Sequence, residues 1–597
     1  MSQTSEPSIE TDKQPPRFIR AMRSLGDRRM AAMFLLSLAA GIPYGAVIGA
    51  LNAWLTEADV DPSRIGVLSF IILAYSFKFI WAPGFQRSSY PLKQSFGPRR
   101  AWLLTFQLII ASLIGLMALT DPANSLPIVA GAALLIALAS ATHDIVLDAW
   151  RIEVAETDED LDLMSALYQF GYRIAGLLTG ALALVLSSRV GWPGTFGILG
   201  GFMVLATLGT FIAPEPAEID RPENSTLAEA SGVSEQSRDS VVAAVMIAWG
   251  VGIFFILSFM FDVLTYQPIS AEQWAAANGP PGQPSGGVFI RTTGPLVVGL
   301  TVLLPALLAA YLNQKSRIDL GVRKTSDAVY ASIVLPLRDL TKRLGWAFIL
   351  IFALVLTYRF ADLVWGAFAY PFYLDDRFGA LFRSPDEIAL ASKTFGVIMT
   401  MLGSALGAVA LIFLGRMPCL VIGGALAAAT NLLFADLAAG RFIAETATFL
   451  PTEGGVRVQA FLAFTQLDHV LGAIPPIFGL ENSTGLTNLM GAIAGENLAV
   501  GFASVASVAF LTSIVNPKYA AVQYALLASL TMLIGSLGRA PLGDIIESHG
   551  YYTVFMITFW IGLVPVILSI LEWARQIKHG PPSVHDSDND TVADGSA

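Results

Sequence analysis

The chain has 597 residues, of which 54% are hydrophobic and only 14% are charged, and its mean hydropathy is +0.62. Soluble domains carry about 25% charged residues, so this composition excludes an ordinary water-soluble protein and indicates a polytopic membrane protein. Cys419 is the only cysteine, which excludes a disulfide framework and a cysteine-based metal or redox site. The net charge of −10 says less than the positions of the basic residues, because topology follows Lys and Arg in short loops.

The first part of the chain predicts a half-protein of six transmembrane helices. Residues 1–29 are polar and basic, so we expect a cytoplasmic tail and no secretory signal peptide. Six apolar runs follow within residues 30–213, each of roughly the 20 residues that a helix needs to cross a bilayer. They lie at 30–55, 65–85, 100–119, 126–150, 163–187 and 192–213.

The remainder predicts two additional helices and a second half. Residues 214–343 form a linker with apolar runs at 242–264 and 292–313, followed by a basic loop. Residues 344–574 form the second half, with runs at 344–375, 388–413, 417–437, 491–515, 518–543 and 551–574. Residues 438–490 are predicted to be a long periplasmic excursion, in which 460–478 is an interfacial or buried helix rather than a span. Residues 575–597 are expected to be a disordered cytoplasmic tail.

The distribution of basic residues predicts the orientation. With a cytoplasmic N-terminus, about 24 of the 36 Lys and Arg fall in cytoplasmic segments, as the positive-inside rule requires. Both termini should then be cytoplasmic. The predicted fold class is an all-α polytopic membrane protein of about 14 helices: two six-helix halves plus two extra helices, the plan of the major facilitator fold.

The end of the fourth run concentrates charge in an apolar context. Asp144, Asp148 and Arg151 lie at i, i+4 and i+7 and share one face of a helix, with His143 and Glu153 beside them. An ionised group at the centre of a membrane helix costs roughly 2.5–3.5 kcal/mol, so this stripe should face a partner or a water-filled cavity.

Three interpretations of the stripe stay open: a static ion network with Arg151 and Glu153, proton coupling, and substrate binding. A carboxylate beside an arginine suits coupling because its hydration and pairing change together. Asp144 lies deeper and is the better candidate for protonation, whereas Arg151 and Glu153 suit an inner gate. His143 is either a proton relay or a hydrogen-bonded structural residue.

Other ionisable residues interrupt apolar runs. Arg173 needs an acidic partner, for which we expect Asp144 or Asp148; gripping a substrate carboxylate is the alternative. Arg359 and Asp362, at i and i+3, can satisfy one another or exchange partners during transport. Lys78 can form a salt bridge, contact substrate or extend to the interface.

Eight blocks of sequence resemble the AmpG muropeptide permease family of the major facilitator superfamily. The first half contains GIPYGAVIGALNAWLTEADV (41–60), YSFKFIWAP (75–83), GPRRAWLL (97–104), SATHDIVLDAWRIE (140–153) and GYRIAGLLTGALAL (171–184). The second half contains YRFADLVWGAFAYPFY (358–373), DEIALASKTFGVI (386–398) and YAAVQYALLASL (519–530). The chain departs from the family at Gly84-Phe85-Gln86-Arg87, which lacks the usual Asp before Arg, at Val522, where a hydroxyl is usual, and in its long excursion.

The resemblance implies proton-driven import of anhydro-muropeptides across the bacterial inner membrane for peptidoglycan recycling, with the imported fragments able to signal β-lactamase induction. Such a substrate presents sugar faces, hydroxyls, amides and carboxylates, so its pocket should combine aromatic, amide and cationic groups. The residues with this chemistry are Asn52, Trp54, Lys78, Tyr172, Tyr358, Trp365, Gln523 and Tyr524.

No phosphate-cradling loop, nucleophile elbow or metal motif occurs, so we expect no enzyme activity and no cofactor other than the proton gradient. The expected partners are the small-molecule substrate and membrane lipid, with no nucleic acid, and the expected state is a monomer. The alternatives are a transporter of another substrate, such as acetyl-CoA, or a non-transporting receptor or assembly factor on the same fold.

Overall fold

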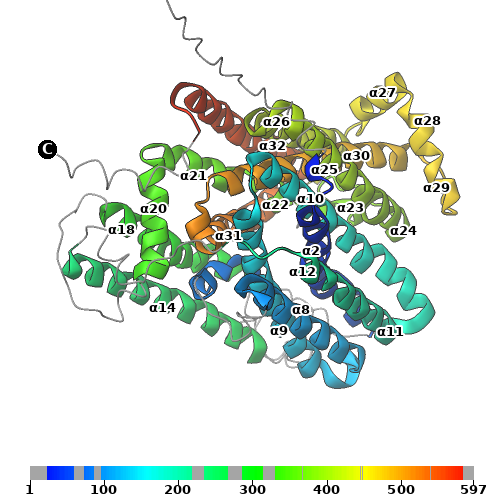
Figure 1. Cartoon of the computed structure of the whole chain (residues 1–597). Helices are drawn as coiled ribbons and strands as arrows, with labels where there is room; N and C mark the ends of the chain where they lie inside the picture. Colours follow the sequence, from blue (N-terminus) through cyan, green and yellow to red (C-terminus); the bar gives the residue numbers. More distant parts are fainter. Residues whose placement is uncertain are drawn as a thin grey trace, which may run out of the picture.

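The computed structural model describes residues 23–58, 71, 73–86, 96–217, 234–265, 286–312, 330–365, 368–443, 446, 448–537 and 539–581. These residues are almost entirely helical (Figure 1). The predicted tails lie mostly outside the described residues, although the last helix continues to His579.

The first half is built from helices that match the predicted spans, with several short interruptions. Its elements are α2 (Arg28–Gly45), η1 (Ala46–Ala50), α3 (Leu51–Glu57), α5 (Leu73–Ser76), η3 (Lys78–Ile80), α6 (Pro83–Gln86), α8 (Pro98–Ala118), α9 (Pro122–Val154), α10 (Asp158–Leu177), η4 (Leu178–Leu182), α11 (Ala183–Ala206) and α12 (Leu208–Ile212). The predicted span at 65–85 lies partly outside the described residues, and its remaining part is broken into α5, η3 and α6. Gly191, at φ 71°, turns the chain within α11, between two predicted spans.

The linker contains more helix than its charge pattern suggested. Its elements are α14 (Glu235–Thr265), α16 (Gly286–Thr292), α17 (Gly294–Val298), η5 (Gly299–Leu303), α18 (Leu304–Leu312), η6 (Tyr330–Val334) and α20 (Leu335–Leu344). We predicted a basic loop up to residue 343, but α20 is an amphipathic helix that buries Leu337, Leu340 and Leu344. The apolar residues of α20 recur at helical spacing, but the basic residues between them led to the prediction of a loop.

The second half has a more broken course. Its elements are α21 (Ala347–Tyr358), α22 (Phe360–Trp365), α23 (Ala369–Leu374), α24 (Pro385–Ile388), η7 (Ala389–Gly396), α25 (Val397–Leu414), α26 (Arg416–Leu437), β1 (Gly440–Ile443), β2 (Thr448–Pro451), α27 (Val456–Thr465), α28 (Leu467–Gly472), α29 (Ile474–Ile477), α30 (Thr484–Ser513), η8 (Pro517–Tyr519), α31 (Ala520–Leu537) and α32 (Arg539–His579). The single span predicted at 344–375 is wrong in detail, because the chain forms three short helices there.

The predicted excursion forms a small substructure of its own. β1 and β2 pair antiparallel, with Gly440 opposite Pro451, and α27 to α29 follow. The single helix predicted at 460–478 is instead interrupted at Gln466, which has a left-handed φ of 59°. In Figure 1 these yellow helices project from the molecule on the side away from α14 and α18, and within the described residues α27 is too short to count as a span.

Ten helices among the described residues are long and apolar enough to cross a membrane, or eleven when α20 with η6 and α21–α22, bent by 110°, is counted as one span. One of the ten, Asp158–Ile212, has 55 residues and contains two predicted spans. The total of fourteen therefore stays a prediction.

Close helix packing within the second half depends on two of its glycines. A Cβ on Gly403 of α25 would collide with the backbone of Leu498 on α30, and one on Gly407 would lie 3.1 Å from the Phe502 backbone. The spacing of these glycines predicted such packing. Across the halves, α10 packs against α25 and α30, and α9 packs against α31.

Candidate functional site

The centre of the polar site is Asp148 on α9, which lies between two cations. The Lys78 Nζ is 3.6 Å from Asp148 Oδ2, and Arg151 Nη2 donates to Asp148 Oδ1 at 3.0 Å. All three side chains are buried, and that of Arg151 is 0% exposed. The Asp148 carboxylate of the predicted stripe therefore has two cationic partners. Arg151 lies on α9 itself, and Lys78 lies on η3.

Arg151 also joins the two halves. Its guanidinium lies 4.8 Å from the ring centroid of Tyr168 on α10 and 5.2 Å from that of Tyr524 on α31. A guanidinium over an aromatic face gains electrostatic energy, and more so when both groups are desolvated. The Nε and Nη1 atoms of Arg151 are buried without a hydrogen bond to a described residue. The aromatic rings are thus important partners of this charge, and one of them belongs to the second half.

Asp144 lies one helical turn before Asp148 and is much less satisfied. Its Oδ1 is buried without a hydrogen bond to any described residue, and the Nδ1 atom of His143 lies 3.9 Å from it. A buried, unsatisfied carboxylate oxygen is costly when the group is ionised. Asp144 and Asp148 therefore have the same chemistry but different environments.

A hydrogen-bond chain assigns the tautomer of His143. The Thr210 hydroxyl donates to Gln107 Oε1 at 2.7 Å, so the amide nitrogen of Gln107 faces His143 Nε2 at 3.2 Å. Because that nitrogen donates, His143 Nε2 accepts, and the ring proton of a neutral His143 resides on Nδ1, toward Asp144. His143 thus has a structural hydrogen bond at Nε2, and its Nδ1–H donor lies on the side of Asp144.

Among the described residues, Glu153 forms its ion pair with Arg99 rather than with Arg151. The guanidinium of Arg99 on α8 donates to both carboxylate oxygens, at 2.8 and 2.6 Å. Arg99 also donates to the Phe85 carbonyl at 2.8 Å. The pair fastens the end of α9 to α8 and α6, where the sequence lacks the Asp of the usual family motif.

Glu215 stabilises the same region from beyond α12. Its carboxylate accepts the backbone N–H groups of Arg99 and Arg100 at 2.8 and 3.2 Å, which caps the start of α8. Burial raises the pKa of Glu215, and the two hydrogen bonds act in the opposite direction. A polar cavity of about 390 Å³ lies between Glu215, Glu153 and Asp27, at this end of the bundle.

The expected pairing of Arg173 with Asp144 or Asp148 is wrong. No ion pair within 4.0 Å joins Arg173 to a described carboxylate, and its buried Nε has no hydrogen-bond partner among the described residues. Sequence spacing fixed the face of α10 on which Arg173 lies, but it could not show which group lies opposite that face.

Arg359 and Asp362 satisfy one another, as their spacing predicted. Arg359 Nε donates to Asp362 Oδ2 at 2.9 Å, and Arg359 Nη1 donates to the Ser504 hydroxyl on α30 at 2.7 Å. Arg359 follows α21 directly and precedes α22, so the pair occupies the break between these helices.

The proposed sugar-binding residues are dispersed. Tyr172 lies beside Tyr44 and Tyr168, with both centroid distances 5.9 Å, and is near Arg173 in sequence. Asn52 donates to the Ile48 carbonyl of its own helix at 2.9 Å, and Trp54 stacks on Trp192. The Tyr358 hydroxyl donates to the Leu420 carbonyl at 2.9 Å. The Trp365 side chain lies outside the described residues.

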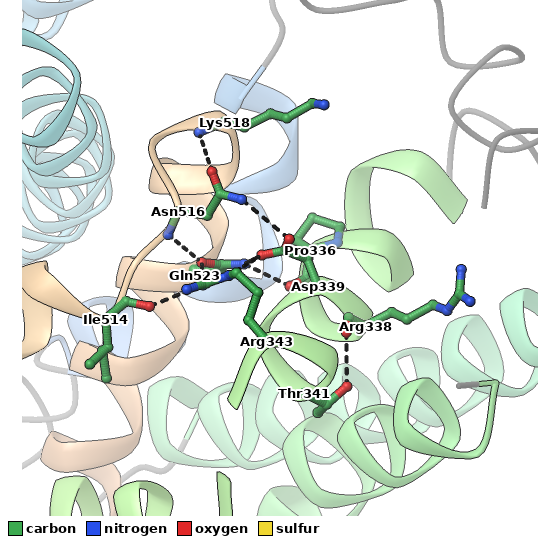
Figure 2. A network of polar contacts seen from close by, with 9 residues as sticks. All are labelled: Pro336, Arg338, Asp339, Thr341, Arg343, Ile514, Asn516, Lys518 and Gln523. Atoms are coloured by element: carbon green, nitrogen blue, oxygen red, sulfur yellow. Dashed lines mark hydrogen bonds and ion pairs between the residues drawn. The ribbon is translucent and has the colours of Figure 1, made fainter. Parts of the chain in front are cut away.

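Gln523 forms a satisfied network with residues of α20 and of the segment before α31 (Figure 2). Its amide nitrogen donates to the Pro336 carbonyl and to Asp339 Oδ2, both at 2.8 Å, and its oxygen accepts the Asn516 N–H at 2.8 Å. Arg343 donates to Asp339 at 3.0 Å and to the Ile514 carbonyl at 3.0 Å. With its hydrogen bonds used in this way, Gln523 ties α20 to the start of α31.

An ion pair joins the two halves at the starts of α10 and α26. Arg416, at the start of α26, pairs with Asp162 Oδ1 at 2.6 Å and with Asp158 Oδ1 at 3.2 Å, both on α10. The sequence analysis did not select Arg416, Arg99, Gln107 or Tyr168. An arginine at a loop and an aromatic residue on an amphipathic helix are common, so only the tertiary contacts distinguish these residues.

Comparisons with known proteins identify the class. Residues 33–358 match the model of the Major Facilitator Superfamily, and a solved structure described as an auto-inhibited POT family peptide transporter shares the fold, with a TM-score of 0.50, 12% identity, and coverage of 92% of this chain and 97% of that one. The chain belongs to the major facilitator superfamily, and is thus a multi-pass membrane transporter and not an enzyme.

The similar curated proteins include AmpG transporters. An anhydromuropeptide permease of Escherichia coli K12 is 35% identical over 198 residues, which are 33% of this chain and 40% of that protein. This chain therefore aligns with less than half the length of that relative. A putative transporter AmpG 4 of Rickettsia conorii is 24% identical over 548 residues, covering 91% of this chain and 96% of the relative. Both relatives confirm the resemblance to the AmpG family that the sequence blocks predicted.

Proposed function

We propose that this transporter imports anhydro-muropeptides, with or without attached peptide, across the bacterial inner membrane and that protons drive the import. The names of the similar proteins support the substrate, and the blocks of sequence shared with the AmpG family lie in both halves. In this proposal the protein acts as a monomer with both termini in the cytoplasm. The imported fragments feed peptidoglycan recycling and are available as signals for β-lactamase induction.

The observation that supports proton coupling best is the difference between the two carboxylates of α9. Asp148 has Lys78 and Arg151 beside it, whereas the buried Oδ1 of Asp144 has no hydrogen bond from a described residue. We assign the exchanged proton to Asp144. His143 Nδ1 then provides a donor when Asp144 is ionised, and Asp148 keeps Arg151 in place against Tyr524 of the second half.

Movement of the halves would change the environment of this cluster. Because Arg151 packs on both Tyr168 and Tyr524, separation of α9 from α31 removes one aromatic face and admits water. Water favours the ionised carboxylate, whereas closure favours the protonated one. Proton release and opening are therefore linked by the same contact.

Uptake of labelled anhydro-muropeptide into membrane vesicles tests the proposal. With a pH gradient directed inward, we expect accumulation above the external concentration, and without the gradient only equilibration. Acetyl-CoA and peptidoglycan fragments are added in parallel samples as competitors of the labelled substrate. Uptake of no fragment would exclude the substrate, and uptake that ignores the gradient would exclude the coupling.

A further inference from the structure

Three side chains of the first half form a buried polar chain that ends beside Asp144. The Thr210 hydroxyl of α12 donates to Gln107 Oε1 of α8 at 2.7 Å, and the Gln107 amide nitrogen lies 3.2 Å from His143 Nε2 on α9. Thr210, Gln107 and His143 each have an exposed fraction of 0%. These polar groups are therefore shielded from solvent and depend on one another for hydrogen bonds.

The end of this chain at Asp144 is incomplete. His143 Nδ1 and Asp144 Oδ1 lie 3.9 Å apart, and both are buried atoms without a hydrogen-bond partner among the described residues. The separation is about 1 Å longer than an N–H···O hydrogen bond. Buried polar atoms are normally hydrogen-bonded, so these two facing atoms indicate a bond that forms when the charge on Asp144 changes.

The Gln107 amide decides what His143 can do. Because its nitrogen donates to Nε2, the neutral ring carries its proton on Nδ1, on the side of Asp144. A relay through the ring would need a proton to reach Nε2, where the Gln107 N–H already donates. The chain therefore suits a fixed hydrogen-bond donor and does not suit a proton relay.

We propose that Gln107 and Thr210 are positioning residues for proton coupling. They act by holding His143 as a hydrogen-bond donor toward Asp144. This inference rests on the proposed function, in which Asp144 exchanges the proton. When Asp144 is ionised, a movement of about 1 Å completes the hydrogen bond from Nδ1 and stabilises the carboxylate. The protonated carboxyl gains less from this donor, so the donor favours proton release.

The chain from Thr210 to His143 lies entirely within the first half, on α12, α8 and α9. α9 packs against α8 and also against α31 of the second half. Movement of one half against the other changes the contact with α31, but it leaves the contacts among α8, α9 and α12 within one rigid unit. The donor toward Asp144 therefore keeps its position while the access of water to the carboxylate changes.

Other titratable groups around α9 do not account for this donor. On α9 itself, Asp148 is held by Lys78 of η3 and by Arg151. Apart from charged residues at helix ends, the titratable side chains on the other elements packed against α9 are Tyr44, Tyr75, Tyr168, Tyr172, Arg173, Lys518, Tyr519 and Tyr524. Tyrosines are neutral near pH 7, and Arg and Lys keep their charge there. A change in pH dependence caused by a substitution at Thr210 is therefore assigned to the chain through Gln107 and His143.

The tautomer of His143 provides a readout that does not depend on transport. The protein has five histidines, so isotope-labelled rings can be resolved by solid-state NMR in membranes, with the His143 signals identified by their loss in His143→Gln. Near pH 7, wild type should show a protonated Nδ1 and an unprotonated Nε2. Thr210→Val removes the hydroxyl donor and frees the Gln107 amide to turn, so both tautomers should be present.

The pH dependence of uptake provides the second readout. Without the fixed donor, ionised Asp144 is less stable and holds its proton up to a higher pH. The external pH at half-maximal gradient-driven uptake should therefore rise by about 1–2 units in Thr210→Val, the equivalent of one hydrogen bond to a charged group. Thr210→Ser keeps the hydroxyl and should restore both the wild-type tautomer and the wild-type midpoint.

Thr195→Val is the matched control. Thr195 is another threonine of the first half with an exposed fraction of 0%, and its hydroxyl donates to the Gly191 carbonyl at 2.8 Å. This variant removes a buried hydroxyl without changing the chain from Thr210 to His143, so it should keep the wild-type tautomer and midpoint. The control thus separates positioning of His143 from a general effect of losing a buried hydroxyl.

The outcomes separate the inference from the function on which it rests. If wild-type His143 is protonated on Nε2, or if Thr210→Val changes neither the tautomer nor the midpoint, the positioning role is excluded and proton-driven import stands. A changed tautomer with an unchanged midpoint also excludes the role, because the donor then has no effect on coupling. If wild type shows no gradient-driven uptake, the proposed function fails and the role in coupling fails with it, whatever the tautomer.

Discussion

The two charged clusters within the membrane differ in how far the protein itself satisfies them. Around Asp148, the cations Lys78 and Arg151 both pair with the Asp148 carboxylate, whereas the buried Oδ1 of Asp144 has no hydrogen bond from a described residue. In the second half, Arg359 donates to Asp362 and to Ser504, so this ion pair is satisfied by its own neighbours. Charged groups are costly to bury in both places, but only the second cluster leaves no carboxylate of its own without a partner.

This difference indicates different roles. The Arg359–Asp362 pair can keep its geometry through the cycle, whereas an unsatisfied carboxylate such as Asp144 can exchange a proton as its surroundings change. Short stretches of sequence revealed both clusters, because Asp144, Asp148 and Arg151 share one helix and Arg359 and Asp362 are three residues apart.

Removing the central carboxylate should have the largest effect. Asp148→Ala leaves Lys78 and Arg151 buried without their shared partner, and breaking such a pair costs about 3–5 kcal/mol. We expect a large loss of folded protein in membranes and a lower Tm in detergent. Asp376→Ala, at an exposed loop carboxylate, is the matched control and should behave as wild type. An unchanged Tm for Asp148→Ala would show that the cluster is not a structural unit.

Neutralising the other carboxylate should separate transport from stability. Asp144→Asn keeps the shape of the side chain and removes its charge. Because the buried Oδ1 of Asp144 accepts no hydrogen bond from a described residue, the Tm should change little. Accumulation driven by a pH gradient should fall to the level seen without a gradient, while exchange of internal for external substrate continues. Gradient-driven accumulation that survives in Asp144→Asn would remove this residue from the coupling step.

The cross-half ion pair of Arg416 can be followed with the single native cysteine. Cys419 is buried three residues after Arg416, which pairs with Asp162. Loss of the pair in Arg416→Gln should favour opening of this end by about 1–2 kcal/mol, or roughly 5- to 30-fold faster labelling by a maleimide. Arg377→Gln should leave the rate unchanged. Equal rates in Arg416→Gln and wild type would mean that the pair does not hold this end closed.

The same reagent tests the predicted orientation. If this end is cytoplasmic, a membrane-impermeant maleimide should label Cys419 in inside-out vesicles and not in right-side-out vesicles, in the Arg416→Gln background. Labelling only from the outside would reverse the predicted topology.

The smallest effect concerns the start of α2. Asp27 accepts the Arg29 N–H at 2.8 Å, and the hydrogen bond from the Arg29 side chain is the main cause that lowers the pKa of Asp27 from 3.8. Because the folded-state pKa is the lower one, this stabilisation is present above about pH 4 and is lost as the pH falls through the folded value. Asp27→Ala should cost about 1 kcal/mol at neutral pH and less in acid, whereas Asp27→Asn retains the cap. The Tm in detergent measures this cost at each pH. A cost of Asp27→Ala that does not change with pH would contradict the assignment of the cap to the ionised Asp27 carboxylate.

The sequence by itself determined the class of protein and most helices. Apolar runs of sufficient length give spans whatever their neighbours are, because an unsatisfied backbone cannot remain in hydrocarbon. Helical spacing likewise brought Asp144, Asp148 and Arg151 to one face and paired Arg359 with Asp362. Local periodicity was also sufficient for the packing glycines of α25.

Only the tertiary structure decided which charges meet. Lys78 pairs with Asp148, Glu153 pairs with Arg99, and the buried Nε of Arg173 has no hydrogen-bond partner among the described residues. The tertiary structure also divides the predicted span at 344–375 into three helices, and the Gln523 side chain links α31 to α20. Such contacts depend on how helices from distant parts of the chain cross and rotate, and helical periodicity fixes a residue's face without specifying what lies opposite it.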